Sequence, residues 1–133
     1  MSVVVGYVHT DEGHAALAAA LDILDDGEHL VVVNKPEPDE LGEFSEEQDT
    51  DALRDTLVER GVDAEVVTLY AADEPAALIL DQAVAHAARL IVIGLRRRSP
   101  VGKLLLGSTA LQVLFEAPCP VLTVRAGTVD PDV

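Results

Sequence analysis

The chain has 133 residues, 49% of them hydrophobic, which fits one domain with a sizeable core and excludes wholesale disorder. Its 24 acidic residues against nine Lys and Arg give a net charge of -15, which disfavours binding to duplex DNA or anionic lipid. With no secretory signal, no apolar run as long as a membrane span, and a single cysteine, Cys119, the protein is expected in a reducing cytoplasm.

The acidic surface also leads to a hypothesis about the source of the protein. Lysine occurs only at Lys35 and Lys103, while Asp and Glu abound. Acidic surfaces stay soluble in concentrated salt, where screening reduces their self-repulsion. We therefore expect a halophilic protein, and an ordinary acidic protein is the alternative.

Short apolar runs alternate with amphipathic segments along the chain. The apolar runs predict buried strands at residues 3–8, 29–34, 64–69, 90–94 and 121–124. The segments between them predict helices at about residues 10–24, 50–60, 73–88 and 108–116, with Thr10, Asp73 and Ser108 as N-caps. This alternation is typical of a single-domain, doubly wound α/β fold, an open, mostly parallel sheet with helices on both faces.

Two further segments are expected to lie outside these elements. Residues 36–48 are acidic, with two prolines and a glycine, and predict a long solvated loop; a lid over a binding site is the alternative. Residues 127–133 predict a frayed tail, which leaves residues 1–126 as the domain.

A basic, glycine-punctuated segment from Gly94 to Thr109 is the strongest indication of a binding site. It contains four of the nine Lys and Arg residues and no acid. It leaves the end of the fourth predicted strand, and Gly107-Ser108 begins the next helix. Ligands of open α/β sheets bind at the carboxyl ends of strands, and helix N-termini attract phosphate. The segment therefore predicts an anion site.

Two common phosphate-binding motifs do not explain this segment. The residues ending in Gly102-Lys103 lack the first glycine of a P-loop, and Leu104 stands where that motif has Ser or Thr. The first strand is followed by His9-Thr10-Asp11 rather than by a dinucleotide-binding glycine motif.

The order of residues around this segment resembles the universal stress protein family. That pattern is a strand, glycine, two residues, a second glycine, nine residues, glycine with Ser or Thr, a helix, and a Pro-Cys-Pro-Val-Leu-x-Val strand. Here Gly94, Gly107-Ser108 and residues 117–124 match it, while Arg97 stands in place of the second glycine. With the first strand and helix included, the resemblance covers essentially the whole chain.

This resemblance implies five parallel strands in the order 3-2-1-4-5, as in the adenine nucleotide alpha hydrolases. It also implies a homodimer that pairs the last strands, here Val121, Leu122, Thr123 and Val124. The family acts in stress survival and regulation, generally without established catalysis; some members bind ATP or related adenine nucleotides and others do not. We therefore expect a regulatory or sensor protein with at most slow ATP hydrolysis, and with Mg²⁺ only as a companion of the nucleotide. The alternative is a dimeric protein-interaction module that binds no nucleotide.

The expected ligand-binding residues come from three strand ends and one helix start. They are Gly6, Tyr7, Val8, His9, Val33, Gly94, Arg96, Arg97, Gly107, Ser108 and Thr109. Those after the fourth strand would hold phosphate by charge and backbone donors, and those of the first two strands would flank the base.

Two departures from the family pattern affect this expectation. ATP-binding members usually have Asp at the end of the first strand, where this chain has Val8, and loss of a carboxylate weakens recognition of the base or ribose. At the second departure, the Arg97 side chain either blocks the turn that glycine would form or clamps a phosphate with its guanidinium group.

Simpler roles compete at several of these positions. Arg96, Arg97 and Arg98 are alternatively surface partners of acidic side chains, although such pairs contribute only ~0–1 kcal/mol each. Lys103 is expected at the loop surface. His9 is a solvated loop histidine, a base-stacking residue or, in an enzyme, the evident general base.

The remaining histidines, His14, His29 and His86, lack metal-ligand spacing, so no metal site is expected. Cys119 is expected to be a buried, inert thiol.

Overall fold

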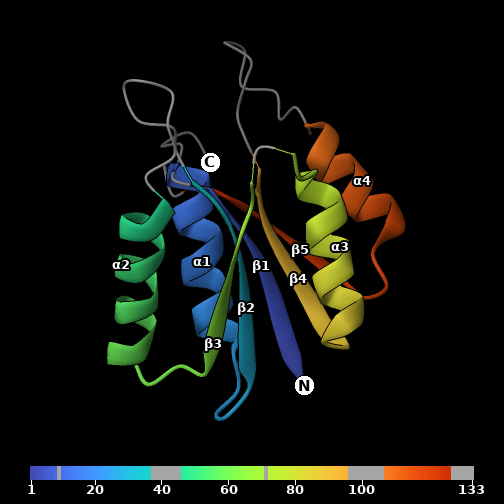
Figure 1. Cartoon of the computed structure of the whole chain (residues 1–133). Helices are drawn as coiled ribbons and strands as arrows, with labels where there is room; N and C mark the ends of the chain where they lie inside the picture. Colours follow the sequence, from blue (N-terminus) through green and yellow to red (C-terminus); the bar gives the residue numbers. More distant parts are fainter. Residues whose placement is uncertain (9, 37–45, 71, 96–106, 127–133) are drawn as a thin grey trace, which may run out of the picture.

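A computed structural model describes the chain except for residues 9, 37–45, 71, 96–106 and 127–133, and describes only the backbone of residues 46–49. Within the described residues, five strands alternate with four helices (Figure 1). In chain order they are β1 (Ser2–Val8), α1 (Asp11–Ile23), β2 (His29–Lys35), α2 (Glu46–Glu59), β3 (Ala64–Thr68), α3 (Pro75–Ala85), β4 (Ala88–Leu95), α4 (Ser108–Glu116) and β5 (Val121–Arg125).

The five strands form one parallel sheet in the order β3-β2-β1-β4-β5. This confirms both the α/β class and the strand order that the family resemblance implies. The chain adds β2 and β3 on one side of β1, then returns to place β4 and β5 on the other. The strand order therefore reverses between β1 and β4, which is the position where such sheets form ligand crevices.

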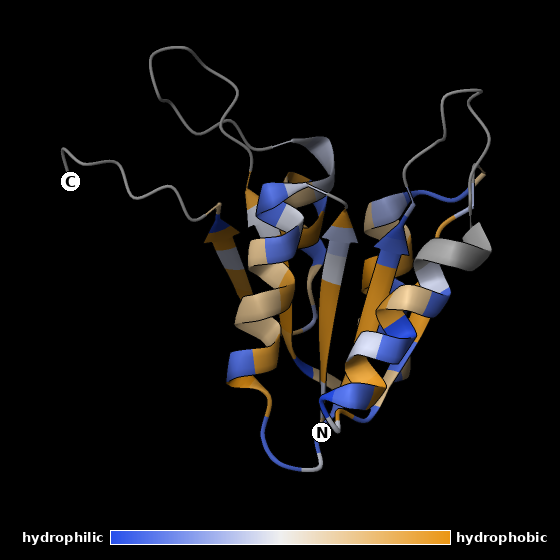
Figure 2. Cartoon of the chain, turned by 90° about the vertical axis from the view of Figure 1, so that its left-hand side faces the viewer, coloured by the Kyte–Doolittle hydropathy of each residue, from blue (hydrophilic) through white to orange (hydrophobic). Residues whose placement is uncertain are grey.

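Helices cover both faces of the sheet (Figures 1 and 2), because alternate strand residues point to opposite sides. On β1, Val3 and Val5 pack with Ala16 of α1 and Leu57 of α2. Val4 packs into the other cluster, which contains residues of α3 and α4. Strands buried on both faces are continuously apolar, which explains the apolar run at the start of the chain.

Helix ends account for most differences from the predicted boundaries. Asp73 is not an N-cap, because its carboxylate accepts a hydrogen bond from the Tyr70 backbone N–H at 2.8 Å and thus stabilises the turn before the helix. Glu74 holds the cap position without a side-chain hydrogen bond. The helix ends at Ala85 rather than about residue 88, since Ala87 adopts a left-handed φ of 48°.

The acidic segment and the last helix also differ from expectation. Helix α2 begins at Glu46, so the last three residues of the expected 36–48 loop are helical, and residues 37–45 lie outside the described residues. Ser108 is the first residue of α4, and Gly107 is its N-cap, with no side-chain cap hydrogen bond.

An ion pair between Arg89 and Glu28 connects elements at the amino end of the sheet. Arg89 on β4 donates two hydrogen bonds to the Glu28 carboxylate, at 2.6 and 2.7 Å, and a third to the Ile23 carbonyl at 3.1 Å. Glu28 lies just before β2 and its side chain is only 5% exposed. The hydrogen bond from Arg89 lowers the pKa of Glu28 to about 2, against the opposing effect of burial. The pair joins the end of α1 to β2 and β4.

Across the described part of the chain, no helix has both the length and the hydropathy to cross a membrane.

Candidate functional site

A cavity of about 300 Å³ opens at the carboxyl ends of β1, β2 and β4, where the strand order reverses. These ends lie at the top of the sheet in Figure 1, beside the start of α4. Known small-molecule sites begin at about this volume, so the cavity suits a compact ligand.

Two glycines allow α1 to approach the strand ends at the cavity. A Cβ on Gly13 would overlap the Val8 carbonyl oxygen, and a Cβ on Gly94 would lie 2.5 Å from the Glu12 carbonyl oxygen. Both contacts are with backbone atoms, so a side chain at either position would displace α1 from β1 or β4. Gly94 was expected to serve a phosphate loop, and the structure gives it this packing role at the cavity wall.

The start of α1 differs from the start of α4 in how its backbone donors are satisfied. In α1 the Thr10 hydroxyl accepts a hydrogen bond from the Gly13 N–H at 3.2 Å. In α4 the Gly107 N-cap has no side chain to do this, and Ser108 and Thr109 face the cavity in the first turn. The first N–H groups of a helix have no acceptor inside the helix, and the helix dipole is positive there. The α4 end of the cavity is therefore suited to an anion.

The other walls of the cavity are mainly apolar. Val8, Val33, Leu69, Ile79 and Ile93 contribute aliphatic side chains from four strand ends and from α3. Such a surface suits the face of a planar heterocycle, and the contrast with the polar α4 end suits a ligand with one apolar and one anionic part. Glu12 and Lys35 add one charge of each sign to the lining.

Eight of the eleven expected binding residues line this one cavity. They are Gly6, Tyr7, Val8, Val33, Gly94, Gly107, Ser108 and Thr109. The other three, His9, Arg96 and Arg97, lie outside the described residues, as do Arg98 and Lys103. Leu95, the residue before these arginines, lines the cavity.

Sequence reasoning missed the remaining residues of the lining. They are Glu12, Lys35, Leu69, Pro75, Ile79, Ile93, Leu95 and Ala110. Lys35 follows directly after a predicted strand and Leu69 is the last residue of another, so the carboxyl-end rule would have found them. Pro75 and Ile79 belong to a helix whose placement over the cavity depends on the tertiary fold.

Two expectations about isolated side chains change in the structure. Cys119 is half-buried rather than buried, and desolvation raises the pKa of its thiol, which fits an inert cysteine. His29 and His86, distant in sequence, have ring centroids 5.5 Å apart, whereas His14 lies beside Tyr7 at 5.6 Å.

Comparison with known proteins finds a family model, a sequence relative and solved structures that all belong to one family. The model of the universal stress protein family matches residues 1–125. A universal stress protein of Thermus aquaticus is 37% identical, over 93% of this chain and 98% of that protein. A universal stress protein structure from Archaeoglobus fulgidus is 29% identical, with a TM-score of 0.67, over 93% of this chain and 98% of that one. A structure from the same organism in complex with dAMP is 26% identical, with a TM-score of 0.62, over 93% of this chain and 97% of that one.

Proposed function

The chain belongs to the universal stress protein family, and on that premise we propose that it is a regulatory protein that binds an adenine nucleotide in the cavity at the reversal of strand order. The observation that carries this proposal is the convergence of Gly6, Val33, Gly94 and Ser108, from four separate elements, on one cavity. The similar Archaeoglobus fulgidus protein in complex with dAMP supports the choice of ligand class.

In this proposal the two parts of the ligand occupy the two ends of the cavity. The base lies among the aliphatic side chains of Val8, Val33 and Ile79, where an apolar face is removed from water. The phosphate lies at the start of α4, against the first N–H groups and the hydroxyls of Ser108 and Thr109. His9, Arg96 and Arg97 are part of the same proposal, with the arginines adding charge on the phosphate side.

Gly107 offers a way to test the phosphate end without disturbing the fold. Its φ is -69°, which any residue adopts, and a Cβ there would meet no atom of the described residues within 4 Å. Neither the backbone conformation nor a contact with the described residues therefore requires glycine at this position. A close approach of phosphate to the backbone does place that demand, and a branched side chain would block it.

Calorimetric titration with AMP, ADP and ATP in molar KCl tests the function. We expect wild type and Gln112→Val, a matched change at an exposed site of α4 outside the cavity lining, to bind equally. Gly107→Val is expected to weaken binding at least tenfold while its melting temperature stays close to that of wild type. Absence of binding at millimolar nucleotide, or equal binding by both variants, would refute the proposal.

The same titration distinguishes the two roles of Arg97. If its side chain blocks the turn, Arg97→Gly tightens nucleotide binding, whereas the variant weakens binding if the guanidinium group clamps a phosphate.

Repeating the titration with MgCl₂ tests whether Mg²⁺ accompanies ATP. We expect hydrolysis to be slow or absent.

A homodimer through β5 is the second part of the proposal. β5 is an edge strand that pairs with β4, and Val121–Val124 are half-buried, so their surface remains partly open. The helix that leads into it, α4, exposes Leu111, Leu114 and Phe115, the last to 84%. Unpaired strand edges and apolar patches favour association.

Light scattering in molar KCl measures this association. We expect a dimer that Phe115→Glu weakens at least tenfold, while Val58→Glu, at an apolar residue of α2 that is 74% exposed, leaves it unchanged. A monomeric wild type would contradict the dimer. A dimer that binds no nucleotide would favour a protein-interaction module. The cytoplasmic location remains part of this proposal.

A further inference from the structure

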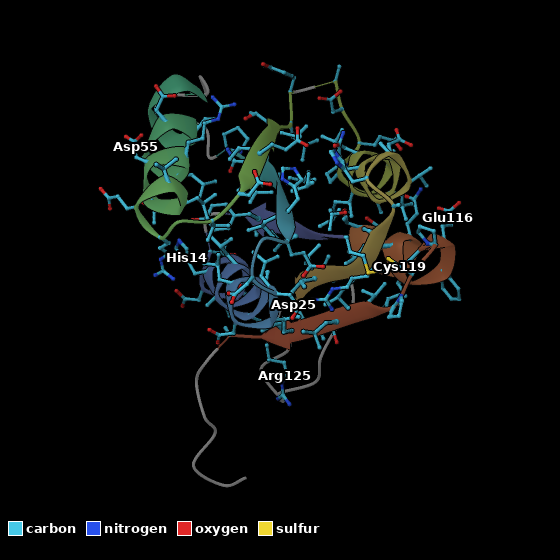
Figure 3. All side chains as sticks on the ribbon, turned by 90° about the horizontal axis from the view of Figure 1, so that it is seen from below. His14, Asp25, Asp55, Glu116, Cys119 and Arg125 are labelled. Carbon is cyan, nitrogen blue, oxygen red and sulfur yellow. The ribbon has the colours of Figure 1, made fainter. Side chains whose placement is uncertain are left out.

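A second cluster of chemically active side chains lies at the opposite end of the sheet from the cavity. His29 is the first residue of β2, Glu65 lies on β3, and His86 is the C-cap of α3. One ligand atom from each lies within 4.8 Å of the other two. Figure 3 views the molecule from this end. Pro75 and Ile79 of α3 line the cavity, so this helix connects the two regions.

The distances within the cluster are close to those of a metal site. Glu65 Oε1 lies 3.2 Å from His29 Nε2 and 2.8 Å from His86 Nε2. Two ligand atoms at zinc bond lengths of about 2.0–2.1 Å, in tetrahedral arrangement, are roughly 3.3 Å apart. The two distances from Glu65 are therefore near those between two ligands of one zinc ion, whereas the two histidine nitrogens, within 4.8 Å of each other, would move closer together on binding.

The two carboxylate neighbours of His29 favour a cation in the cluster. Its Nδ1 lies 3.2 Å from the Asp63 carboxylate, while its Nε2 faces Glu65. A neutral imidazole has one N–H group, so if Nδ1 donates to Asp63, a nitrogen lone pair faces a carboxylate oxygen at Nε2. A proton or a metal ion relieves that repulsion. Carboxylate partners on the second nitrogen are the usual means by which proteins orient metal-binding histidines.

The surroundings also favour a cation that enters from solvent. The side chains of His29 and His86 are 29% and 28% exposed, and that of Glu65 is 44% exposed, so an ion can reach them. His86 lies at the C-terminal end of α3, where the helix dipole is negative. The net charge of -15 raises the local concentration of cations around the protein.

We propose that His29 Nε2, Glu65 Oε1 and His86 Nε2 bind one divalent transition-metal ion of the zinc type, with Asp63 orienting His29. Two imidazoles and one carboxylate suit Zn²⁺ and Co²⁺ better than Mg²⁺ or Ca²⁺, which prefer oxygen ligands. Water completes the coordination shell. The ion would cross-link β2, β3 and the end of α3 and thereby stabilise this end of the domain.

Titration of the chelator-treated full chain with ZnCl₂ tests the site directly. Molar KCl and millimolar MgCl₂ in the buffer suppress weak binding to the many surface carboxylates. We expect one Zn²⁺ per chain, and visible absorption bands of a site of low coordination number when Co²⁺ replaces it. His86→Gln and Glu65→Gln are expected to lower the affinity at least tenfold, whereas His14→Gln, outside the cluster, keeps it.

Thermal melting gives a second readout that separates the metal from a proton. Zn²⁺ should raise the melting temperature of wild type and of His14→Gln, but not that of His86→Gln, because only binding to the folded state stabilises it. Melting of the metal-free variants confirms that they fold. Failure of wild type to bind Zn²⁺, or equal binding by His86→Gln and His14→Gln, would overturn the proposal.

Discussion

For the replacement of Gly13 by alanine, helix propensity and packing predict opposite changes in the free energy of unfolding. Gly13 is the third residue of α1, where helix propensity alone predicts that alanine stabilises the protein by at most about 1 kcal/mol. The structure places the new Cβ in overlap with the Val8 carbonyl oxygen, and 2.7 Å from its carbonyl carbon. Relief requires α1 to move away from β1, and overpacking of this kind costs about 3 kcal/mol at the upper end of its usual range. The expected net result is a loss of about 2 kcal/mol.

Urea denaturation at neutral pH in constant KCl measures this difference. Gly107→Ala is the matched control, because its new Cβ meets no atom within 4 Å in the described part of the chain, and it should change the free energy of unfolding by less than about 1 kcal/mol. The slope of the free energy against urea should be unchanged in both variants. If Gly13→Ala is as stable as wild type or more stable, close contact between α1 and β1 is not what requires glycine there.

Three further variants test other contacts. Glu28→Gln should destabilise the protein by about 1–2 kcal/mol at pH 7, after allowance for solvent screening around Arg89. Because folding lowers the pKa of Glu28 from 4.5 to about 2, its stabilising effect is present above pH 4.5 and lost as the pH falls towards 2, so denaturation curves of wild type and variant should converge over that window. Thr10→Ala should cost about 1 kcal/mol in thermal melts by removing the α1 cap, whereas Thr56→Ala, at an exposed position of α2, should not. Val8→Asp should tighten AMP binding about tenfold in calorimetry if the missing carboxylate weakens recognition of the ribose, and unchanged affinity would contradict that explanation.

Much of the fold was predictable because the strands carry a simple signal. Strands buried on both faces are continuously apolar, so 3–8, 29–34 and 90–94 were recognisable without knowledge of their neighbours. Helix ends were harder to predict, since a capping residue is defined by its hydrogen bonds rather than by its residue type. Asp73 and Ser108 are both of the right type, yet one closes a turn and the other begins a helix.

The two candidate sites differ in how visible they are in the sequence. The cavity lies where strands end, so residues such as Gly6, Val33 and Gly94 were found by their position near the carboxyl ends of apolar runs. His29 and His86 are on β2 and at the end of α3, and nothing in their spacing links them. Their proximity depends on the packing of α3 against the sheet. A cluster assembled in this way is detectable only from the tertiary structure.

The central claim is that an adenine nucleotide binds at the carboxyl ends of the strands, and chemical shift mapping of the amide groups with AMP tests it most directly. We expect the resonances of Gly6, Gly94, Ser108 and Thr109 to move in a saturable manner. Those of His29 and Glu65, at the opposite end of the sheet, should stay in place. Unchanged cavity resonances at millimolar AMP, or shifts confined to other parts of the molecule, would contradict the account.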